Sequence, residues 1–236
     1  ADKALWTENA EGARISVTQA GTEQDEAMMI ADRIQQDVRN GRRTYGQFAI
    51  LYRTNAQSRV MEEAFLTNRI PHVLIGGQRF YERKEVKDML AYLRLAHNPR
   101  DDASFRRVIN VPTRGIGATS LAAIDAKGRA ADISLFEAAR DQALQAALPK
   151  KTASAVRAFL GALSDAQEMI ERHATVTEIL RELYRTSGYL DALRGDPSED
   201  SIARLDNLQE FLNVASEFDH TADEPNLGSF LESVAL

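Results

Sequence analysis

The sequence predicts an α/β fold, in which a parallel-sheet subdomain is followed by an all-helical accessory domain. Three segments with strand patterns, 14–19, 48–52 and 71–75, alternate with helical patterns in the first third of the chain. Such alternation is typical of parallel strands joined by right-handed crossovers. After Ile75 only helical periodicity is found. The chain is 44% hydrophobic and 27% charged over 236 residues, which predicts a globular protein with a real core.

The predicted strands rest on local patterns. Segment 14–19 alternates in polarity and is rich in β-branched residues, which favours a strand. Segment 48–52 is a short continuous apolar run, the pattern of a strand buried on both faces of a parallel sheet. Segment 71–75 follows as a third strand, which Gly76 and Gly77 end.

The predicted helices are marked by apolar residues spaced three and four apart. The first stripe covers 27–38 and ends at Asn40-Gly41, and a capping box at 54–57 begins the second helix. Later stripes predict helices near 86–93, 103–109, 121–124, 135–139, 156–163, 176–183 and 205–215. The stretch 148–151 is the predicted domain boundary.

Charge is distributed unevenly along the chain. The formal net charge is −6, which argues against a nonspecific nucleic-acid binder. Segment 69–114, however, contains ten basic and five acidic residues. A local basic patch fits a polyanionic partner at one face. The alternative is a set of solvated helix faces, and charge alone does not separate the two.

Several classes of protein are excluded by what the sequence lacks. There is no cysteine and only four scattered histidines, so we expect no metal site. No apolar run reaches the roughly 20 residues of a membrane span, and no apolar leader is present, so we expect a cytoplasmic protein with no membrane partner. No phosphate loop, nucleophile elbow or dinucleotide fingerprint occurs.

Two places carry residues suited to ligand chemistry. Tyr52 and Arg53 follow a predicted strand, where an aromatic ring can stack on a base and a guanidinium can clamp phosphate oxygens. The turn 110–117 offers small glycines and Arg114 before a helix, an arrangement that suits a phosphate. The alternatives are a surface arginine and a plain helix corner. The hairpin 186–189 leaves the same choice open, and so do two lysines on the polar side of the stripe 86–93.

Four segments, in order, resemble sequence blocks of the UvrD/PcrA/Rep family of DNA helicases. Segment 48–59 is similar to motif IV of that family, 76–94 to the next block and 110–117 to the one after, while 6–9 resembles the approach to this domain. The helical remainder matches more loosely. The resemblance implies a RecA-like motor domain, 2A, with appended helices over 1–147, and a helical accessory domain, 2B, over 148–236.

The resemblance also implies roles for these residues. Tyr52 would stack on the adenine of ATP, and Arg53 would reach the γ-phosphate as the catalytic arginine. The candidate DNA-binding residues are Thr113, Arg114, Gly115, Ile116, Gly117, Lys84, Lys87, Ser187 and Gly188. Because the family's phosphate loop and metal-binding acidic motif lie upstream, we expect the isolated chain to hold neither ATP nor Mg²⁺ and to lack ATPase activity.

The implied parent is an ATP- and Mg²⁺-dependent helicase that moves 3′ to 5′ along DNA in DNA repair or replication restart. Its expected partners are single-stranded DNA, duplex–single-strand junctions, the remaining helicase domains and repair proteins. Two rival hypotheses stay open: a helicase–nuclease subunit, and a standalone helical adaptor without motor activity. The upstream reading frame would separate the adaptor, which would have no phosphate loop there.

Overall fold

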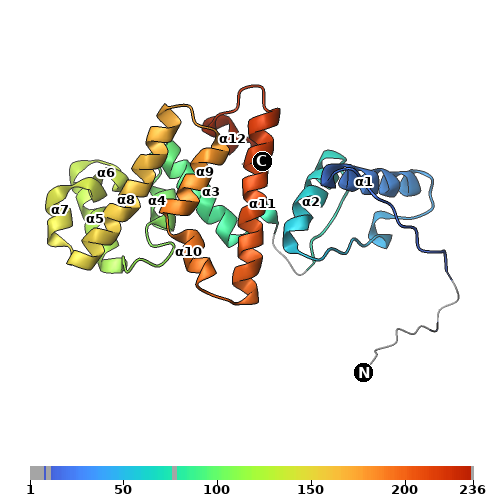
Figure 1. The fold of residues 1–236 in the computed structure, drawn as a ribbon, viewed down its shortest axis with the longest axis horizontal. Helices are drawn as coiled ribbons and strands as arrows, with labels where there is room; N and C mark the ends of the chain where they lie inside the picture. Colours follow the sequence, from blue (N-terminus) through green and yellow to red (C-terminus); the bar gives the residue numbers. More distant parts are fainter. Residues whose placement is uncertain (1–7, 9–11, 76–78, 235–236) are drawn as a thin grey trace. The chain divides into compact units, whose positions relative to one another are not determined.

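The computed structural model describes residues 8, 12–75 and 79–234, and the regular elements of that part of the chain are helices (Figure 1). They are α1 (Glu23–Arg39), η1 (Tyr45–Gln47), η2 (Asn55–Gln57), α2 (Ser58–Thr67), η3 (Phe80–Glu82), α3 (Lys84–His97), α4 (Asp102–Val108), α5 (Ala118–Ala131), α6 (Leu135–Arg140), α7 (Gln142–Ala147), α8 (Lys150–Glu171), α9 (Val176–Thr186), α10 (Tyr189–Arg194), α11 (Glu199–Thr221) and α12 (Leu227–Ser233). The chain divides into two compact units. Unit 1 comprises Ala1–Ile50 and Val60–Val73, and unit 2 comprises Leu51–Arg59 and Leu74–Leu236.

The predicted RecA-like parallel sheet is wrong for this chain, because the described residues contain no strand. Segments 14–19, 48–52 and 71–75 have no regular secondary structure and do not pair with one another. The glycines at 76–77, expected to end the third strand, lie outside the described residues, as does the block 6–9 apart from Glu8.

The exposed apolar side chains of these segments give the physical reason. Ile15 and Val17 are 94% and 93% exposed, and Leu51, Val73 and Ile75 are between 84% and 94% exposed. A strand needs a neighbour to pair its backbone N–H and C=O groups and a layer to cover its apolar face. The strand pattern is local, whereas the partner must come from elsewhere, and the described residues do not supply it.

Unit 1 is built on α1, whose apolar side packs against the part of α2 that follows Arg59. The side chain of Thr22 accepts a hydrogen bond from the backbone N–H of Asp25 and so caps the start of α1. Gly41 adopts a φ of +67° just after the helix, which confirms the end predicted at Asn40-Gly41. The buried apolar residues of unit 1 are Ala27, Ala31, Ile34, Val60, Ala64, Phe65 and Ile70.

Unit 2 is a helical assembly around α3, which contacts α4, α8, α9, α11 and α12. The side chains of Val86, Met89 and Leu93 on α3 are fully buried, in agreement with the predicted stripe. One continuous hydrophobic core extends from η3 to α12. This confirms the helical character predicted beyond Ile75. The proposed domain boundary near Leu148 lies between α7 and α8, inside this unit.

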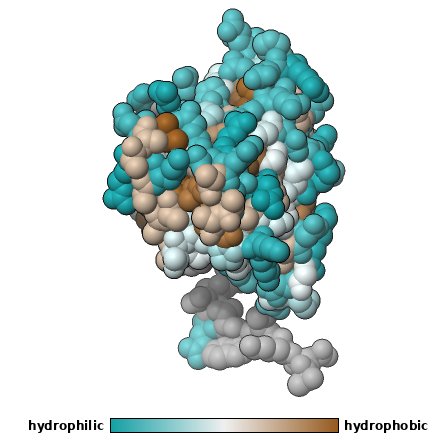
Figure 2. All heavy atoms as spheres, turned by 90° about the vertical axis from the view of Figure 1, so that its left-hand side faces the viewer, coloured by the Kyte–Doolittle hydropathy of each residue, from teal (hydrophilic) through white to brown (hydrophobic). Residues whose placement is uncertain are grey.

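The surface at the α5–α7 end of unit 2 is largely polar. Figure 2 shows hydrophilic residues over most of this face and a smaller group of hydrophobic ones on one side. No helix among the described residues combines the length and the hydropathy that a membrane span requires.

Candidate functional site

The predicted ATP-contacting pair lies in the short segment before η2. Tyr52 is half-buried and Arg53 is exposed. The side-chain oxygen of Gln57 accepts hydrogen bonds from the backbone N–H groups of Arg53 and Thr54, at 3.0 and 3.1 Å, so the predicted capping box is present. Segment 51–59 belongs to unit 2, although the residues before and after it belong to unit 1. The pair is therefore carried by the helical unit and not by a sheet.

A concavity of about 250 Å³ lies beside Arg53, between η2 and the start of α11. It is lined by Arg53, Thr54, Asn55, Glu199, Ile202, Ala203 and Asp206. Two of these, Glu199 and Asp206, are acidic and would repel a phosphate. The concavity is therefore poorly suited to the phosphates of a nucleotide.

The turn 110–117 is folded around the side chain of Asn110. Its Oδ1 atom accepts hydrogen bonds from the backbone N–H groups of Arg114, at 2.8 Å, and Ile116, at 3.1 Å. Between them Gly115 adopts a φ of +75°, a conformation that other residues rarely adopt. Ile116 is buried, so it anchors the turn and does not face a ligand.

Helix α5 begins directly after this turn, with Gly117 as its N-cap. A glycine has no side chain to cap the helix, so the first N–H groups of α5 have no side-chain acceptor at that position. Thr113 and Gly117 are exposed. The exposed amides and the positive end of the helix dipole together favour an anion at this place.

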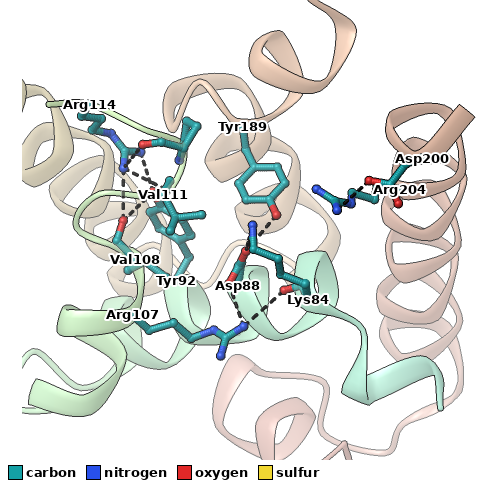
Figure 3. A network of polar contacts seen from close by, with 11 residues as sticks. Lys84, Asp88, Tyr92, Arg107, Val108, Val111, Arg114, Tyr189, Asp200 and Arg204 are labelled. Carbon is teal, nitrogen blue, oxygen red and sulfur yellow. Dashed lines mark hydrogen bonds and ion pairs between the residues drawn. The ribbon is translucent and has the colours of Figure 1, made fainter. Parts of the chain in front are cut away.

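The guanidinium of Arg114 points into the protein and not toward solvent (Figure 3). Its Nη1 atom lies 2.8 to 3.3 Å from the carbonyl oxygens of Val108, Ile109, Val111 and Pro112. Its Nη2 atom donates to the hydroxyl of Tyr92, at 2.5 Å, and to the carbonyl of Ser187, at 2.7 Å. The charge that was expected to face DNA is thus engaged by backbone carbonyls.

The last of these bonds brings the two predicted turns side by side. Gly188, in the second turn, also adopts a φ of +75°, and a Cβ atom placed on it would lie 3.9 Å from the Cγ atom of Pro112. Helix α3 holds both turns: the Tyr92 hydroxyl donates to the carbonyl of Val111, and the Tyr189 hydroxyl donates to Asp88, one helical turn earlier on α3, at 2.9 Å. Two segments about 70 residues apart therefore pack against each other. In the second of them Ser187 is buried and Gly188 is half-buried, so little of that turn is exposed.

Comparison with known proteins now identifies the family. A family model described as the UvrD-like helicase C-terminal domain matches residues 1–236. The chain belongs to this family. It is 40% identical over 238 residues to "ATP-dependent DNA helicase PcrA" of Staphylococcus epidermidis RP62A, covering 99% of the chain and 32% of the relative. The protein of the same name from Bacillus subtilis 168 is 40% identical over 234 residues, covering 99% and 31%. The chain spans about a third of the length of these curated relatives.

The match confirms the resemblance to the UvrD/PcrA/Rep family. Within the chain, basic residues of α3 and α4 lie around the buried carboxylate of Asp88. In this UvrD-like chain Lys84 and Lys87 are exposed on the first turn of α3, and the Nζ atom of Lys84 lies 3.9 Å from a carboxylate oxygen of Asp88. Arg107, on α4, lies 2.8 Å from the other oxygen (Figure 3). Arg107 is exposed but paired with this buried carboxylate, and Arg114 is held by backbone carbonyls, so only part of the basic segment presents unpaired charge.

The two tyrosines that hold the turns are kept in their hydrogen-bond-donating form. Burial raises the pKa of Tyr92 to about 12, although the nearby charge of Arg114 acts to lower it. Burial and then the charge of Asp88 raise the pKa of Tyr189. Both hydroxyls therefore stay protonated at neutral pH, which the bonds to Val111 and Asp88 require.

Sequence reasoning assigned no role to a group of buried polar residues that hold the segment 51–59, although Arg59 and Arg83 lie in the segments that resemble the family. They are Arg59, Arg83, Asn207 and Glu210, each less than a tenth exposed. Polar residues beside the apolar stripe of α11 could have indicated such a group. A polar side chain so close to the core is expected to be buried and hydrogen-bonded to a partner. Their partners, however, lie far away in the sequence and have no local pattern.

Proposed function

We propose that the chain is part of an ATP-dependent DNA helicase that moves 3′ to 5′ along single-stranded DNA in DNA repair or replication restart, in the bacterial cytoplasm. The relatives named as ATP-dependent DNA helicases support the activity. The chain would supply Tyr52 and Arg53 to ATP and two glycine turns to the DNA backbone. Its further partners would be duplex–single-strand junctions, the remaining helicase domains and repair proteins.

ATP hydrolysis would need the remaining helicase domains. Among the described residues no group of three or more histidine or acidic side chains could hold a metal ion. No phosphate loop occurs in the sequence either. We therefore expect the isolated chain to show no ATPase activity, with or without single-stranded DNA.

The hydrogen bond between Arg114 and the carbonyl of Ser187 carries the DNA part of the proposal. It joins two turns that each have a glycine in the left-handed region, and one of them leads into the uncapped end of α5. Contacts made by Thr113, Gly115, Gly117 and the second turn would be to phosphates. They would position the chain on DNA without reading its sequence.

Binding of a duplex–single-strand junction, measured by fluorescence anisotropy at several salt concentrations, tests this proposal. Arg114→Ala should weaken binding about tenfold on junctions of different sequence, because the two turns separate, while binding by every variant weakens with salt. Arg114→Lys should not restore the affinity, since the guanidinium acts through carbonyls. The control is Arg129→Ala, which removes an exposed charge from the far end of α5.

Circular dichroism must first show that each variant is folded. If folded Arg114→Ala binds the junction as tightly as Arg129→Ala does, the turns are corners between helices and the DNA assignment is wrong. If Arg114→Lys binds like the unmodified chain, the charge matters and the orientation seen in the structure is not the one used on DNA.

A further inference from the structure

Segment 51–59 is attached to unit 2 by side chains, because the chain on either side of it belongs to unit 1. The attachment consists of two buried arginines and the helix α11. We propose that Asn207 and Glu210 of α11 are positioning residues that hold Arg53 through Arg83 and Arg59. This inference rests on the proposed contact of Arg53 with ATP, and it concerns residues that touch no nucleotide themselves.

Arg83 makes the first attachment. It is 6% exposed, and its Nη2 atom donates to the carbonyl oxygen of Asn55 and to the hydroxyl of Ser58, both at 2.8 Å. Its Nη1 atom donates to Oδ1 of Asn207, at 2.7 Å. The planar guanidinium therefore joins η2, the start of α2 and α11 with one rigid group, which a lysine ammonium cannot reproduce.

Asn207 completes this junction from the opposite side. Its amide group donates to Oε1 of Glu85 at 2.6 Å while its oxygen accepts from Arg83, so both ends of the amide are used. Asn207 is 4% exposed and Glu85 is 4% exposed. If a substitution at Asn207 removes one of these hydrogen bonds, the buried polar group on the other side, Arg83 or Glu85, loses that bond in a place that water does not reach.

Arg59 makes the second attachment, one residue after Ser58. Its Nε atom donates to Glu210, and its Nη2 atom lies 3.6 Å from a carboxylate oxygen of Glu217. Asn207, Glu210 and Glu217 are spaced three and seven residues apart, so they form one stripe along α11. The helix presents this polar stripe to the segment that carries Arg53, and η2 packs directly on it.

These attachments restrict the position of Arg53 because the attached residues are close to it in the sequence. Asn55, Ser58 and Arg59 lie within six residues of it, and Gln57 holds the N–H group of Arg53 itself. A catalytic guanidinium that is misplaced by about 1 Å can lose much of its effect. Loosening the stripe on α11 should therefore loosen Arg53 without removing any atom that touches ATP.

Hydrogen exchange on the 236-residue chain, followed by mass spectrometry, tests the positioning directly. The amides of Arg53, Thr54 and Gln57 are hydrogen-bonded within the segment and should exchange slowly. In Asn207→Ala their exchange should become about tenfold faster, because the segment opens locally more often. The matched control is Gln209→Ala, an exposed residue of the same helix. If the exchange of segment 53–59 is the same in both variants, the positioning role is wrong.

A second variant covers the case in which Asn207→Ala fails to fold. Glu210→Gln keeps the shape and the acceptor atom for Arg59 and removes only the charge, so it should give a smaller but measurable acceleration of exchange in segment 53–59. An unchanged rate in folded Glu210→Gln would contradict the role of that residue.

Kinetics in the longer helicase separate this inference from the proposed function. Asn207→Ala and Arg83→Lys should lower kcat for ATP hydrolysis several-fold with little change in KM, because an arginine at the γ-phosphate acts mainly in the transition state. If exchange becomes faster but kcat is unchanged, Asn207 does position the segment 51–59, and the proposed role of Arg53 in ATP hydrolysis is wrong. Unchanged exchange would overturn the positioning, whatever the kinetics show.

Discussion

Replacing Arg114 tests whether its guanidinium holds the two glycine turns together. The two shortest bonds to carbonyls join Nη1 to Val111, at 2.8 Å, and Nη2 to Ser187, at 2.7 Å. Hydrogen bonds from a charged group contribute about 1.5–3 kcal/mol each. Because Arg114 is only half-buried, water would replace part of this. Its position over the rings of Tyr92 and Phe159, 5.9 and 5.5 Å from their centroids, adds about 0.5–1 kcal/mol.

We therefore expect Arg114→Ala to lower the free energy of unfolding of unit 2 by about 2–4 kcal/mol. Arg114→Lys should recover only part of the loss, since one ammonium cannot reach both carbonyls in the geometry of the fork. Urea denaturation followed by circular dichroism measures both values, with Arg129→Ala as the control for loss of a surface charge. A loss in Arg114→Ala within about 0.5 kcal/mol of that control would refute the reasoning, because it is the range of ordinary surface substitutions.

Three further predictions concern the glycines of the turn 110–117, the buried hydroxyl of Tyr92 and the predicted ATP-contacting pair. Gly115→Ala should destabilise the chain by about 1–2 kcal/mol because of its positive φ, whereas Gly117→Ala, whose added Cβ meets nothing within 4 Å, should change the thermal midpoint little; equal shifts would contradict this. Because Tyr92 has a folded pKa of about 12, above its unfolded value near 10, its contribution is complete below pH 10 and is lost as pH rises to 12, by roughly 2–3 kcal/mol. Tyr92→Phe should flatten the fall in urea midpoint between pH 9 and 11.5, and an unchanged slope would count against the burial of the hydroxyl. In the longer helicase, Arg53→Ala should reduce kcat on the order of 10³-fold with nucleotide binding retained, while Tyr52→Ala should mainly weaken binding, by about 1–3 kcal/mol; the same kinetic defect in both would contradict the division of roles.

Features that depend on neighbouring residues were predictable. The helix over 27–38, its end at Asn40-Gly41 and the capping box at 54–57 each involve hydrogen bonds between residues three to five positions apart. The strand patterns at 14–19 and 48–52 were equally clear as patterns, yet no strand formed in the described residues. A helix satisfies its own backbone groups, whereas a strand depends on a partner that its own sequence does not contain.

The sequence by itself determined the helices of unit 2, the family and the residue types of the two glycine turns. The tertiary structure alone decided that Arg114 turns inward to Ser187, 73 residues away, and that Arg59 meets Glu210, 151 residues away. It also decided that segment 51–59 belongs to the helical unit. An arginine can donate hydrogen bonds to a phosphate or to a carbonyl. Which of them it meets depends on contacts between distant parts of the chain, which no local pattern records.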